Sequence, residues 1–147
     1  MSVSEMHGHY LEDLKVGMSA VFGKTVTEAD IAAFAGVSGD TNPIHLHDGF
    51  AQTTRFGGRI AHGMLGASFI SAVIGTKLPG PGSLYVSQSL NFKAPVRIGE
   101  TVTARVEIVE IDSTRRRVRL KTECLSGTTV VIDGEAIIMT PRRPAPA

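Results

Sequence analysis

One apolar stretch sets the architecture of this chain, Gly63-Met64-Leu65-Gly66-Ala67-Ser68-Phe69-Ile70-Ser71-Ala72-Val73-Ile74. It is apolar almost all round and contains no Asp or Glu. A helix of this composition has to be buried, and its small residues let neighbouring segments approach closely. It is also too short to span a bilayer, so we expect no membrane segment. The stretch therefore predicts a central helix over residues 63–74, wrapped by something larger than itself.

Segments with strand character follow this helix and supply the wrapping. They alternate in polarity or carry β-branched residues, and turn-forming Gly, Pro, Asp and Ser residues separate them. The predicted strands cover residues 83–92, 101–111, 118–125 and 129–139. Because helices come first and strands follow, the order indicates an α+β fold. We expect one curved antiparallel sheet around the central helix.

A shorter helix is predicted to begin at Thr27, upstream of the central one. Thr27 can cap its first turn, and Asp30 at the third helical position favours a helix N-terminus. The helix should end between Gly36 and Gly39. The residues that follow would then lie in a loop leaving a helix, where functional groups are often presented.

That loop contains the motif Asp40-Thr41-Asn42-Pro43-Ile44-His45. Both Asp40 and His45 can handle protons near neutral pH, and Pro43 stiffens their relative placement. The run His62-Gly63-Met64 opens the central helix, whose first amide could face the same site. Together these features indicate a site that moves protons and stabilises a developing oxyanion, which is the chemistry of adding water to an activated double bond.

The length, net charge and cysteine count limit the possible classes of protein. The 147 residues suit one domain, which we place at residues 1–140, followed by a disordered tail at 141–147. A net charge of +1 gives no reason to expect a nucleic-acid partner, despite the run Arg115-Arg116-Arg117. The lone Cys124 cannot form an intramolecular disulfide and fits a small core residue. The N-terminus has no apolar signal region, so a cytoplasmic location is the default.

Five segments together carry a resemblance to a known family: Tyr10-Leu11-Glu12-Asp13-Leu14-Lys15-Val16-Gly17, Ser38-Gly39-Asp40-Thr41-Asn42-Pro43-Ile44-His45, Ala61-His62-Gly63-Met64, Gln88-Ser89-Leu90-Asn91-Phe92-Lys93-Ala94-Pro95-Val96 and Gly99-Glu100-Thr101-Val102. With them the chain resembles the MaoC-like (R)-specific enoyl-CoA hydratases. The resemblance covers most of the chain up to the tail. It implies the hot-dog fold, a curved antiparallel sheet around a long helix.

The resemblance also implies roles for single residues. Asp40 and His45 would be the catalytic pair. The chemistry of water addition favours Asp40 as the principal base, with His45 orienting the water and delivering the proton, and the division of roles between the two stays open. The backbone N–H of Gly63 would bind the thioester carbonyl. Asn42 would support the loop, and Ser71 would form a hydrogen bond with the aspartate. Apart from the resemblance, His62 is expected to support the site by shaping the loop before the helix, and Met64 and Leu65 are candidates for either the core or the wall of the acyl pocket. His47 is a departure, because relatives often carry an acidic residue there.

The implied activity is reversible hydration of a (2E)-enoyl-CoA to the (3R)-hydroxyacyl-CoA, with a use in supplying polyhydroxyalkanoate synthesis. No metal or other cofactor is implied, since coenzyme A enters as part of the substrate. A homodimer is the implied assembly, because a curled sheet around one helix leaves open edges. Either Lys93 or Arg97 could meet a coenzyme A phosphate, although an exposed basic residue is the simpler interpretation of both.

Three other functions stay open at the level of sequence. A 3-hydroxyacyl-[acyl-carrier-protein] dehydratase would use the same chemistry on another carrier. A hot-dog acyl-CoA thioesterase commonly places a carboxylate on the central helix, where this chain has none. A non-catalytic partner subunit would have no need of Asp40 and His45. Metal binding by His45-Leu46-His47-Asp48 is disfavoured, because no further ligand cluster accompanies it.

Overall fold

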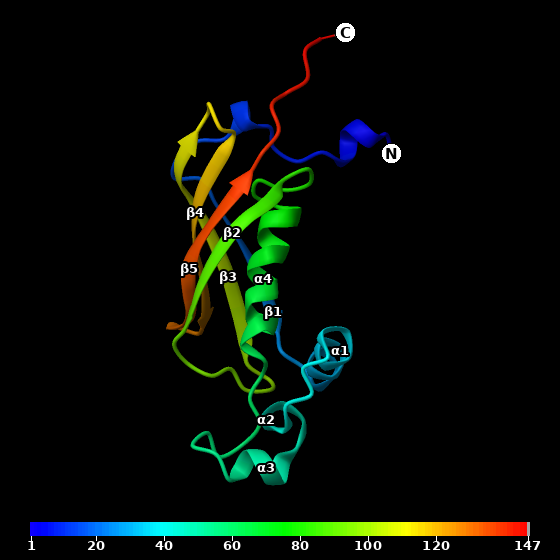
Figure 1. Cartoon of the computed structure of the whole chain (residues 1–147), viewed down its shortest axis with the longest axis vertical. Helices are drawn as coiled ribbons and strands as arrows, with labels where there is room; N and C mark the ends of the chain where they lie inside the picture. Colours follow the sequence, from blue (N-terminus) through cyan, green and yellow to red (C-terminus); the bar gives the residue numbers. More distant parts are fainter. Residues whose placement is uncertain (147) are drawn as a thin grey trace.

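A five-stranded antiparallel sheet and one long helix on its face form the body of the protein (Figure 1). The computed structural model describes residues 1–146. The strand order across the sheet is β1-β3-β4-β5-β2. The strands are β1 (Ser19–Thr25), β2 (Leu84–Phe92), β3 (Thr101–Asp112), β4 (Arg117–Ser126) and β5 (Thr129–Met139). The helices are α1 (Glu28–Ser38), α2 (Pro43–Leu46), α3 (Asp48–Gln52) and α4 (Gly63–Thr76), after 3-10 turns at Val3–Met6 and Leu11–Asp13.

The α+β hot-dog arrangement predicted from the sequence is confirmed by this sheet and helix. The expectation that helices precede all strands is wrong in one respect, since β1 comes before α1 and pairs with β3 at the sheet edge. The strand β1 is short, Gly23 interrupts its β-branched and aromatic residues, and its side chains are only half-buried or exposed. A strand of this kind gives little periodic signal.

Helix α4 is buried on one side only. Its buried residues are Leu65, Gly66, Phe69, Ile70, Val73 and Ile74, and all of them except Gly66 belong to the hydrophobic core. The opposite side is open, with Met64, Ser68 and Ser71 exposed. The expectation of a helix covered on nearly all sides is therefore not met within one chain. An apolar helix with one open side is a feature that a second subunit could cover.

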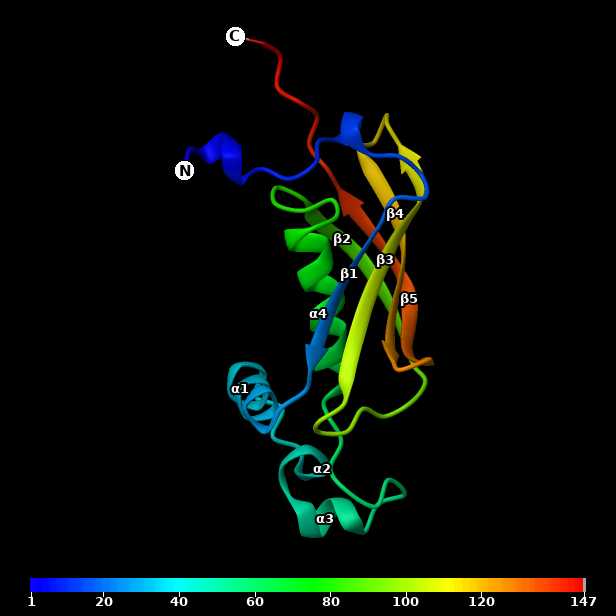
Figure 2. The ribbon, with the colours of Figure 1, turned by 180° about the vertical axis from the view of Figure 1, so that it is seen from behind.

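The short helices α1, α2 and α3 gather at one end of the sheet, beyond the N-terminus of α4, and both chain termini lie at the other end (Figure 2). The start of α1 has the predicted cap: Thr27 Oγ1 accepts from the Asp30 N–H at 3.2 Å, and Asp30 Oδ2 accepts from the Thr27 N–H at 2.9 Å. Gly39, at a φ of +77°, ends the helix. The chain thus turns sharply just before Asp40.

Among residues 1–146, no helix is both long and apolar enough to cross a membrane. Cys124 is fully buried on β4, as predicted, and burial raises the pKa of its thiol to about 12. After β5 the chain has no further helix or strand within the described residues. Arg143 nevertheless pairs with Asp13 at 2.5 Å and lies over the ring of Tyr10. The disorder predicted for the rest of the tail stays a prediction.

Candidate active site

A cavity of about 410 Å³ lies where the loop after α1, the start of α4 and the end of β2 meet. Asp40, His45, His62 and Gly63 all line it. Part of its apolar wall comes from the core and includes Val26, Phe69, Val102 and Ile132. The fold therefore brings the predicted proton-handling residues and the predicted carbonyl donor to one space with an apolar wall. Such a space suits a polar reaction on a substrate with a hydrocarbon part.

Two local caps fix the spacing of Asp40 and His45. Asn42 is the N-cap of α2, and its Oδ1 accepts from the N–H of Ile44 at 3.1 Å. Pro43 occupies the first helical turn, a position that suits its fixed φ. Asp40 Oδ1 in turn accepts from the N–H of Asn42 at 3.2 Å. The supporting role predicted for Asn42 thus has a concrete basis: it holds the turn between the two polar residues.

His45 is buried, with 8 % of its surface exposed. Its Nδ1 lies 2.8 Å from the carbonyl oxygen of Ile60. Since a carbonyl can only accept, Nδ1 carries the proton in the neutral ring and Nε2 keeps a free lone pair. Burial lowers the pKa of His45, and the nearby His62 lowers it further, while the bond to Ile60 and the charge of Asp40 oppose this. His45 is thus arranged as a neutral proton acceptor.

His62 packs directly against His45. The ring centroids are 3.9 Å apart with an interplanar angle of 30°. Donor atoms of Asp40, His45 and His62 all lie within 4.8 Å of one another, so this trio offers a metal-ligand set. One nitrogen of each ring already lies at a backbone carbonyl, Nδ1 of His45 at Ile60 and Nε2 of His62 at Asp40. The same trio can therefore hold and move protons.

Gly63 is the first residue of α4, directly after the N-cap His62. Its N–H belongs to the first turn of the helix, where no intrahelical acceptor exists and the helix dipole is positive. A Cβ atom at this position would lie 2.7 Å from Cε1 of the Phe92 ring. A glycine here lets the aromatic wall of the cavity approach the amide closely. The backbone of Gly63 is thus suited to bind an oxygen with developing negative charge.

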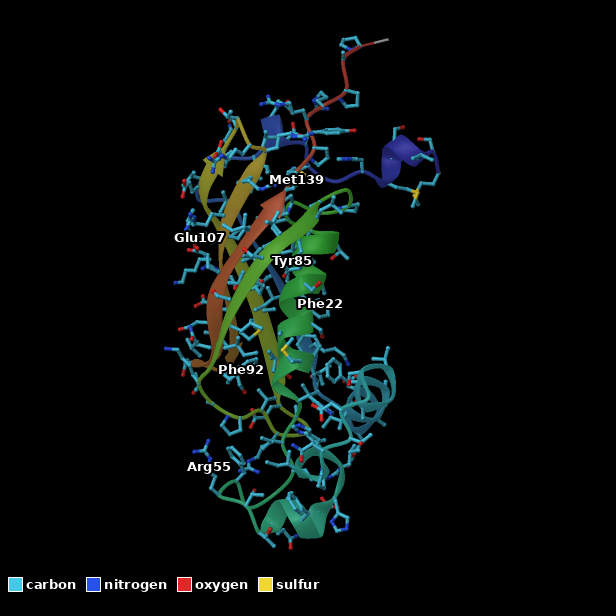
Figure 3. The ribbon with its side chains drawn as sticks, viewed as in Figure 1. Phe22, Arg55, Tyr85, Phe92, Glu107 and Met139 are labelled. Atoms are coloured by element: carbon cyan, nitrogen blue, oxygen red, sulfur yellow. The ribbon has the colours of Figure 1, made fainter. Side chains whose placement is uncertain are left out.

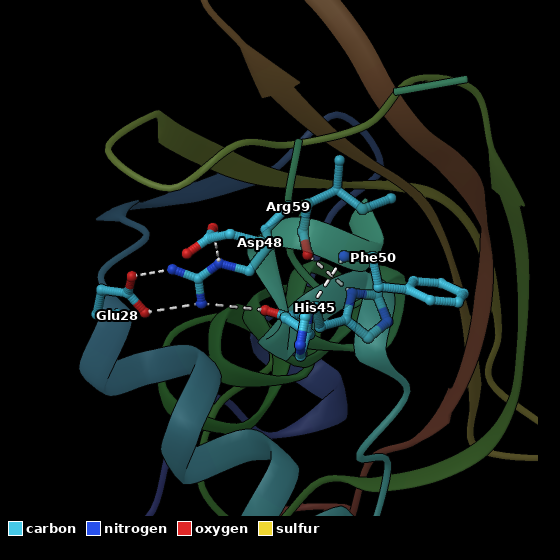
Figure 4. Close-up of polar contacts among 7 residues, drawn as sticks. Glu28, His45, Asp48, Phe50 and Arg59 are labelled. Carbon is cyan, nitrogen blue, oxygen red and sulfur yellow. Dashed lines mark hydrogen bonds and ion pairs between the residues drawn. The ribbon is translucent and has the colours of Figure 1, made fainter. Parts of the chain in front are cut away.

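Arg59 ties the short helices together beneath the site (Figure 4). Its guanidinium pairs with Glu28 of α1 and, at 2.8 Å, with Asp48 of α3, and it donates to the His45 carbonyl of α2 at 3.3 Å. These contacts fix the helix that carries His45. Sequence reasoning missed this residue, since its partners lie 11 to 31 positions away.

The departure at His47 has a structural explanation. His47 is the N-cap of α3, and its Nδ1 accepts from the N–H of Phe50 at 3.0 Å. An acidic side chain at this position would cap the same helix with an oxygen. The change therefore preserves the cap and leaves the Asp40–His45 pair unaffected.

Basic residues lie at the polar edge of the cavity. One of them, Arg55, was not singled out from the sequence. Arg55 lines the cavity from the segment between α3 and α4 and stacks over Phe56 at 4.8 Å (Figure 3). Lys93 also lines the cavity but pairs with Asp133 at 3.0 Å. Arg97 donates to the Phe56 carbonyl. Among the described residues, Arg55 is the cavity-lining cation without an acidic partner.

The other predicted supporting residues take different places. Met64 lines the cavity and is 55 % exposed, and His62 lines it as well. Leu65 belongs to the hydrophobic core and does not line the cavity. Ser71 is exposed on the open side of α4, and within the described part of the chain it makes no hydrogen bond to Asp40. The expected contact between Ser71 and Asp40 is therefore absent from the single chain.

The comparisons with known proteins agree with one another. The family model described as MaoC like domain matches residues 14–130. The chain is 55 % identical to an (R)-specific enoyl-CoA hydratase of Rhodospirillum rubrum, over 97 % of this chain and 99 % of that protein. It is 50 % identical to a 3-hydroxybutyryl-CoA dehydratase of Methylorubrum extorquens, over 95 % and 88 %. The crystal structure of an (R)-hydratase from Aeromonas caviae involved in polyhydroxyalkanoate biosynthesis superimposes with a TM-score of 0.85 at 43 % identity, covering 88 % of this chain and 99 % of that one.

Proposed function

This chain belongs to the MaoC-like domain family, and from that membership we propose that it is an (R)-specific enoyl-CoA hydratase. It adds water to a (2E)-enoyl-CoA, gives the (3R)-hydroxyacyl-CoA, and catalyses the reverse dehydration. The observation that carries the proposal is the meeting of Asp40, His45 and the N-terminal amide of α4 in one cavity. High identity to relatives named as hydratase and dehydratase of CoA thioesters supports the same reaction.

The chemistry follows from what water addition requires. Water is a weak nucleophile, and its attack at C3 of the enoyl group pushes charge onto the thioester oxygen. The N–H of Gly63 and the positive end of α4 stabilise that oxygen. A single donor of this kind typically contributes about 3 kcal/mol, which is roughly a hundredfold in rate. The thioester carbonyl therefore sits at the start of α4, and C3 faces Asp40 and His45.

The tautomer of His45 assigns the proton transfers. One water molecule binds between the Asp40 carboxylate and His45 Nε2, and Nε2 accepts one of its protons as the oxygen bonds to C3. The proton on Nε2 then goes to C2, where the enolate electron pair forms the new C–H bond. The second water hydrogen stays on the product hydroxyl, oriented by Asp40. This division makes His45 the principal base, whereas the sequence had favoured Asp40.

Addition from one pair of residues places oxygen and hydrogen on the same face of the double bond, so the addition is syn. Every proton in this cycle is accounted for by water, Asp40 and His45, so the proposed reaction needs no metal or redox cofactor. Coenzyme A enters as part of the substrate. The absence of a carboxylate on α4 supports hydration over the thioesterase alternative.

Arg55 supports an anionic carrier for the acyl group. It lines the cavity and has no acidic partner, so its guanidinium is free for a phosphate. A coenzyme A thioester has three phosphate groups, and an acyl-carrier-protein substrate has one on its prosthetic arm. The two curated CoA-acting relatives make coenzyme A the proposed carrier.

We also propose a homodimer that pairs through β2 and the open side of α4. Strand β2 is a sheet edge, and it exposes Leu84, Tyr85 and Val86. An unpaired apolar edge beside a half-open apolar helix is a surface that a second copy can cover. Sedimentation analysis of the native protein and of Val86→Lys tests this assembly. A dimer that the lysine converts to a monomer supports the interface, and a native monomer contradicts it.

The cellular setting follows from the proposed reaction. The (3R)-hydroxyacyl-CoA product is a monomer precursor for polyhydroxyalkanoate synthesis, a process in which the Aeromonas caviae relative takes part by its description. We therefore propose a supply role in that synthesis. A cytoplasmic location fits, because the single buried Cys124 needs no oxidising compartment.

The direct test mixes purified protein with crotonyl-CoA and follows the loss of the enoyl-thioester absorbance. Chiral analysis of the product should give the (3R) alcohol, and a thiol reagent should detect no released coenzyme A. Thiol release would indicate the thioesterase alternative. Turnover only with crotonyl-acyl-carrier protein would assign the dehydratase of fatty-acid synthesis. No turnover with either carrier would contradict the proposed reaction.

A further inference from the structure

His62 is a buried histidine that the proposed proton transfers do not use. Only 2 % of its surface is exposed. Its Nε2 lies 2.9 Å from the backbone carbonyl oxygen of Asp40, and because that oxygen can only accept, Nε2 donates the bond. Its Nδ1 is buried and has no hydrogen-bond partner in the described structure. A buried acceptor without a partner destabilises the folded state, so some other advantage has to offset it.

The ring of His62 is held between two other rings. The Phe34 ring of α1 lies 4.9 Å from it at an angle of 57°. The centroid of the His45 ring of α2 lies 3.9 Å away, and the two ring planes are tilted by 30°. The next residue, Gly63, begins α4. One side chain therefore touches the helix before the motif, the Asp40 backbone and the catalytic imidazole.

These contacts act on both members of the catalytic pair. The bond to the Asp40 carbonyl fixes the backbone just after α1 ends, and so fixes where the carboxylate stands. The face of the His62 ring restricts rotation of the His45 ring about its Cβ–Cγ bond. It thereby supports the hydrogen bond from His45 Nδ1 to Ile60, which leaves Nε2 free. Each contact by itself would orient one group. The two contacts together set the distance between the Asp40 carboxylate and the His45 ring.

We propose that His62 is a positioning residue that holds Asp40 and His45 in register for a shared water molecule. This inference rests on the proposed hydratase function and adds a residue to its machinery. The titratable groups facing His62 are His45 and Asp40, and its third neighbour, Phe34, carries no charge.

Two substitutions separate the contacts of this side chain. His62→Gln can place an amide N–H where Nε2 stands, which keeps the bond to Asp40 and removes the ring. His62→Phe keeps a ring against His45 and removes the donor. We expect each variant to lower kcat for crotonyl-CoA by about ten- to a hundredfold, since small misplacements of reacting groups have costs of that order. The KM should stay within about twofold, because His62 is not proposed to bind the carrier.

A pH series distinguishes positioning from a general loss of structure. In His62→Gln the His45 ring loses its neighbour and gains access to water, so the acidic limb of kcat/KM should move to higher pH. In His62→Phe that limb should move less. His9→Gln, which alters a histidine of the N-terminal segment outside the cavity, should retain the native kcat and pH profile. NMR of the histidine rings should show the same order, with a larger rise in the pKa of His45 in His62→Gln than in His62→Phe. This measurement needs no turnover.

The outcomes separate this inference from the proposed function. A native protein that hydrates crotonyl-CoA, with His62 variants that keep its kcat and pH profile, overturns only the role of His62. A drop in kcat that follows the loss of folded protein, with an unchanged pH profile, also overturns it. If the native protein turns over no enoyl thioester, the proposed function fails. The NMR measurement then tests the role of His62 without turnover. If the pKa of His45 is the same in both His62 variants and in the native protein, the proposed effect of His62 on His45 is rejected.

Discussion

The Nδ1 atom of His45 donates a hydrogen bond to the carbonyl oxygen of Ile60, 2.8 Å away, and this bond leaves the lone pair of Nε2 free in a ring that lines the cavity. The acceptor belongs to the segment that leads into α4, only three residues before the Gly63 amide. The proposed base and the proposed carbonyl-binding amide are thus positioned by one stretch of backbone. This coupling explains how a short loop can hold two groups of the reaction in a fixed relation.

The pH dependence of catalysis should reflect the environment of His45. Burial first, and the neighbouring His62 second, lower its pKa below the ordinary value of 6.5. The neutral base therefore persists to lower pH than a free imidazole would allow, and the acidic limb of kcat/KM should lie below pH 6.5. A pH series with crotonyl-CoA measures this limb. A limb above pH 6.5 would contradict the assignment of His45 as a neutral base.

The same shift affects the free energy of unfolding. With the pKa of His45 lower in the folded state, the unfolded chain binds more protons between the two pKa values. Stability should therefore fall as the pH decreases through 6.5, and His45→Gln should make this fall shallower. Chemical denaturation at several pH values measures both slopes. Identical slopes for the two proteins would show that His45 contributes nothing to the pH dependence.

The role of the Gly63 amide can be isolated with two substitutions. In a Phe92→Ala background, which removes the ring 2.7 Å from the Cβ position, Gly63→Ala keeps the N–H and Gly63→Pro removes it. Proline is tolerated at the first helical position, and the extended backbone of His62 suits a following proline. We expect kcat to be about a hundredfold lower for proline than for alanine. Equal kcat values would remove Gly63 from the mechanism.

Arg59 should matter for both stability and turnover. Arg59→Gln loses the ion pairs to Glu28 and Asp48 and the bond to the His45 carbonyl. Because both acidic partners are largely exposed, we expect a modest decrease in Tm of about 3–6 °C. The kcat should also fall, since α2 carries His45. Thermal unfolding and crotonyl-CoA kinetics measure the two effects, and an unchanged kcat would show that α2 needs no such support.

Arg55 should discriminate between carriers. Arg55→Gln removes the cavity-lining cation without an acidic partner, so the KM for crotonyl-CoA should rise about fivefold, as expected for one exposed ionic contact. The KM for crotonyl-pantetheine, which has no phosphate, should not change. Arg115→Gln, on the distant β3–β4 turn, is the matched control. An equal rise for both substrates would assign Arg55 to the uncharged arm of the substrate instead.

The sequence predicted the long elements well, for identifiable reasons. The strands β2 to β5 and the helix α4 have strong periodicity between clear turn residues, and their observed bounds differ by at most two residues from those expected. The helix α1 was predicted from its cap at Thr27. The helices α2 and α3 have only four and five residues, too few to show a period of 3.6.

The site was predictable only in part. Asp40 and His45 belong to one short motif, so their proximity follows from local chain geometry. The contacts of Arg59 with Glu28, and of His62 with His45, join segments that are distant in sequence. A single sequence has no local signal for such contacts. The tautomer of His45 likewise depends on Ile60, fifteen residues away, so the sequence alone does not indicate which nitrogen of His45 can accept a proton.

The central claim is that Asp40 and His45 act as one unit on a single water molecule. Its most direct test compares kcat for crotonyl-CoA hydration in Asp40→Asn, His45→Gln and the double variant, all checked for folding. We predict that each single substitution lowers kcat at least about a hundredfold and that the double variant has nearly the same kcat as either single variant. The reason is that removing one member of a pair that acts together already abolishes the contribution of the other. Losses that multiply in the double variant would show two independent contributions, and either single variant with native kcat would contradict the account.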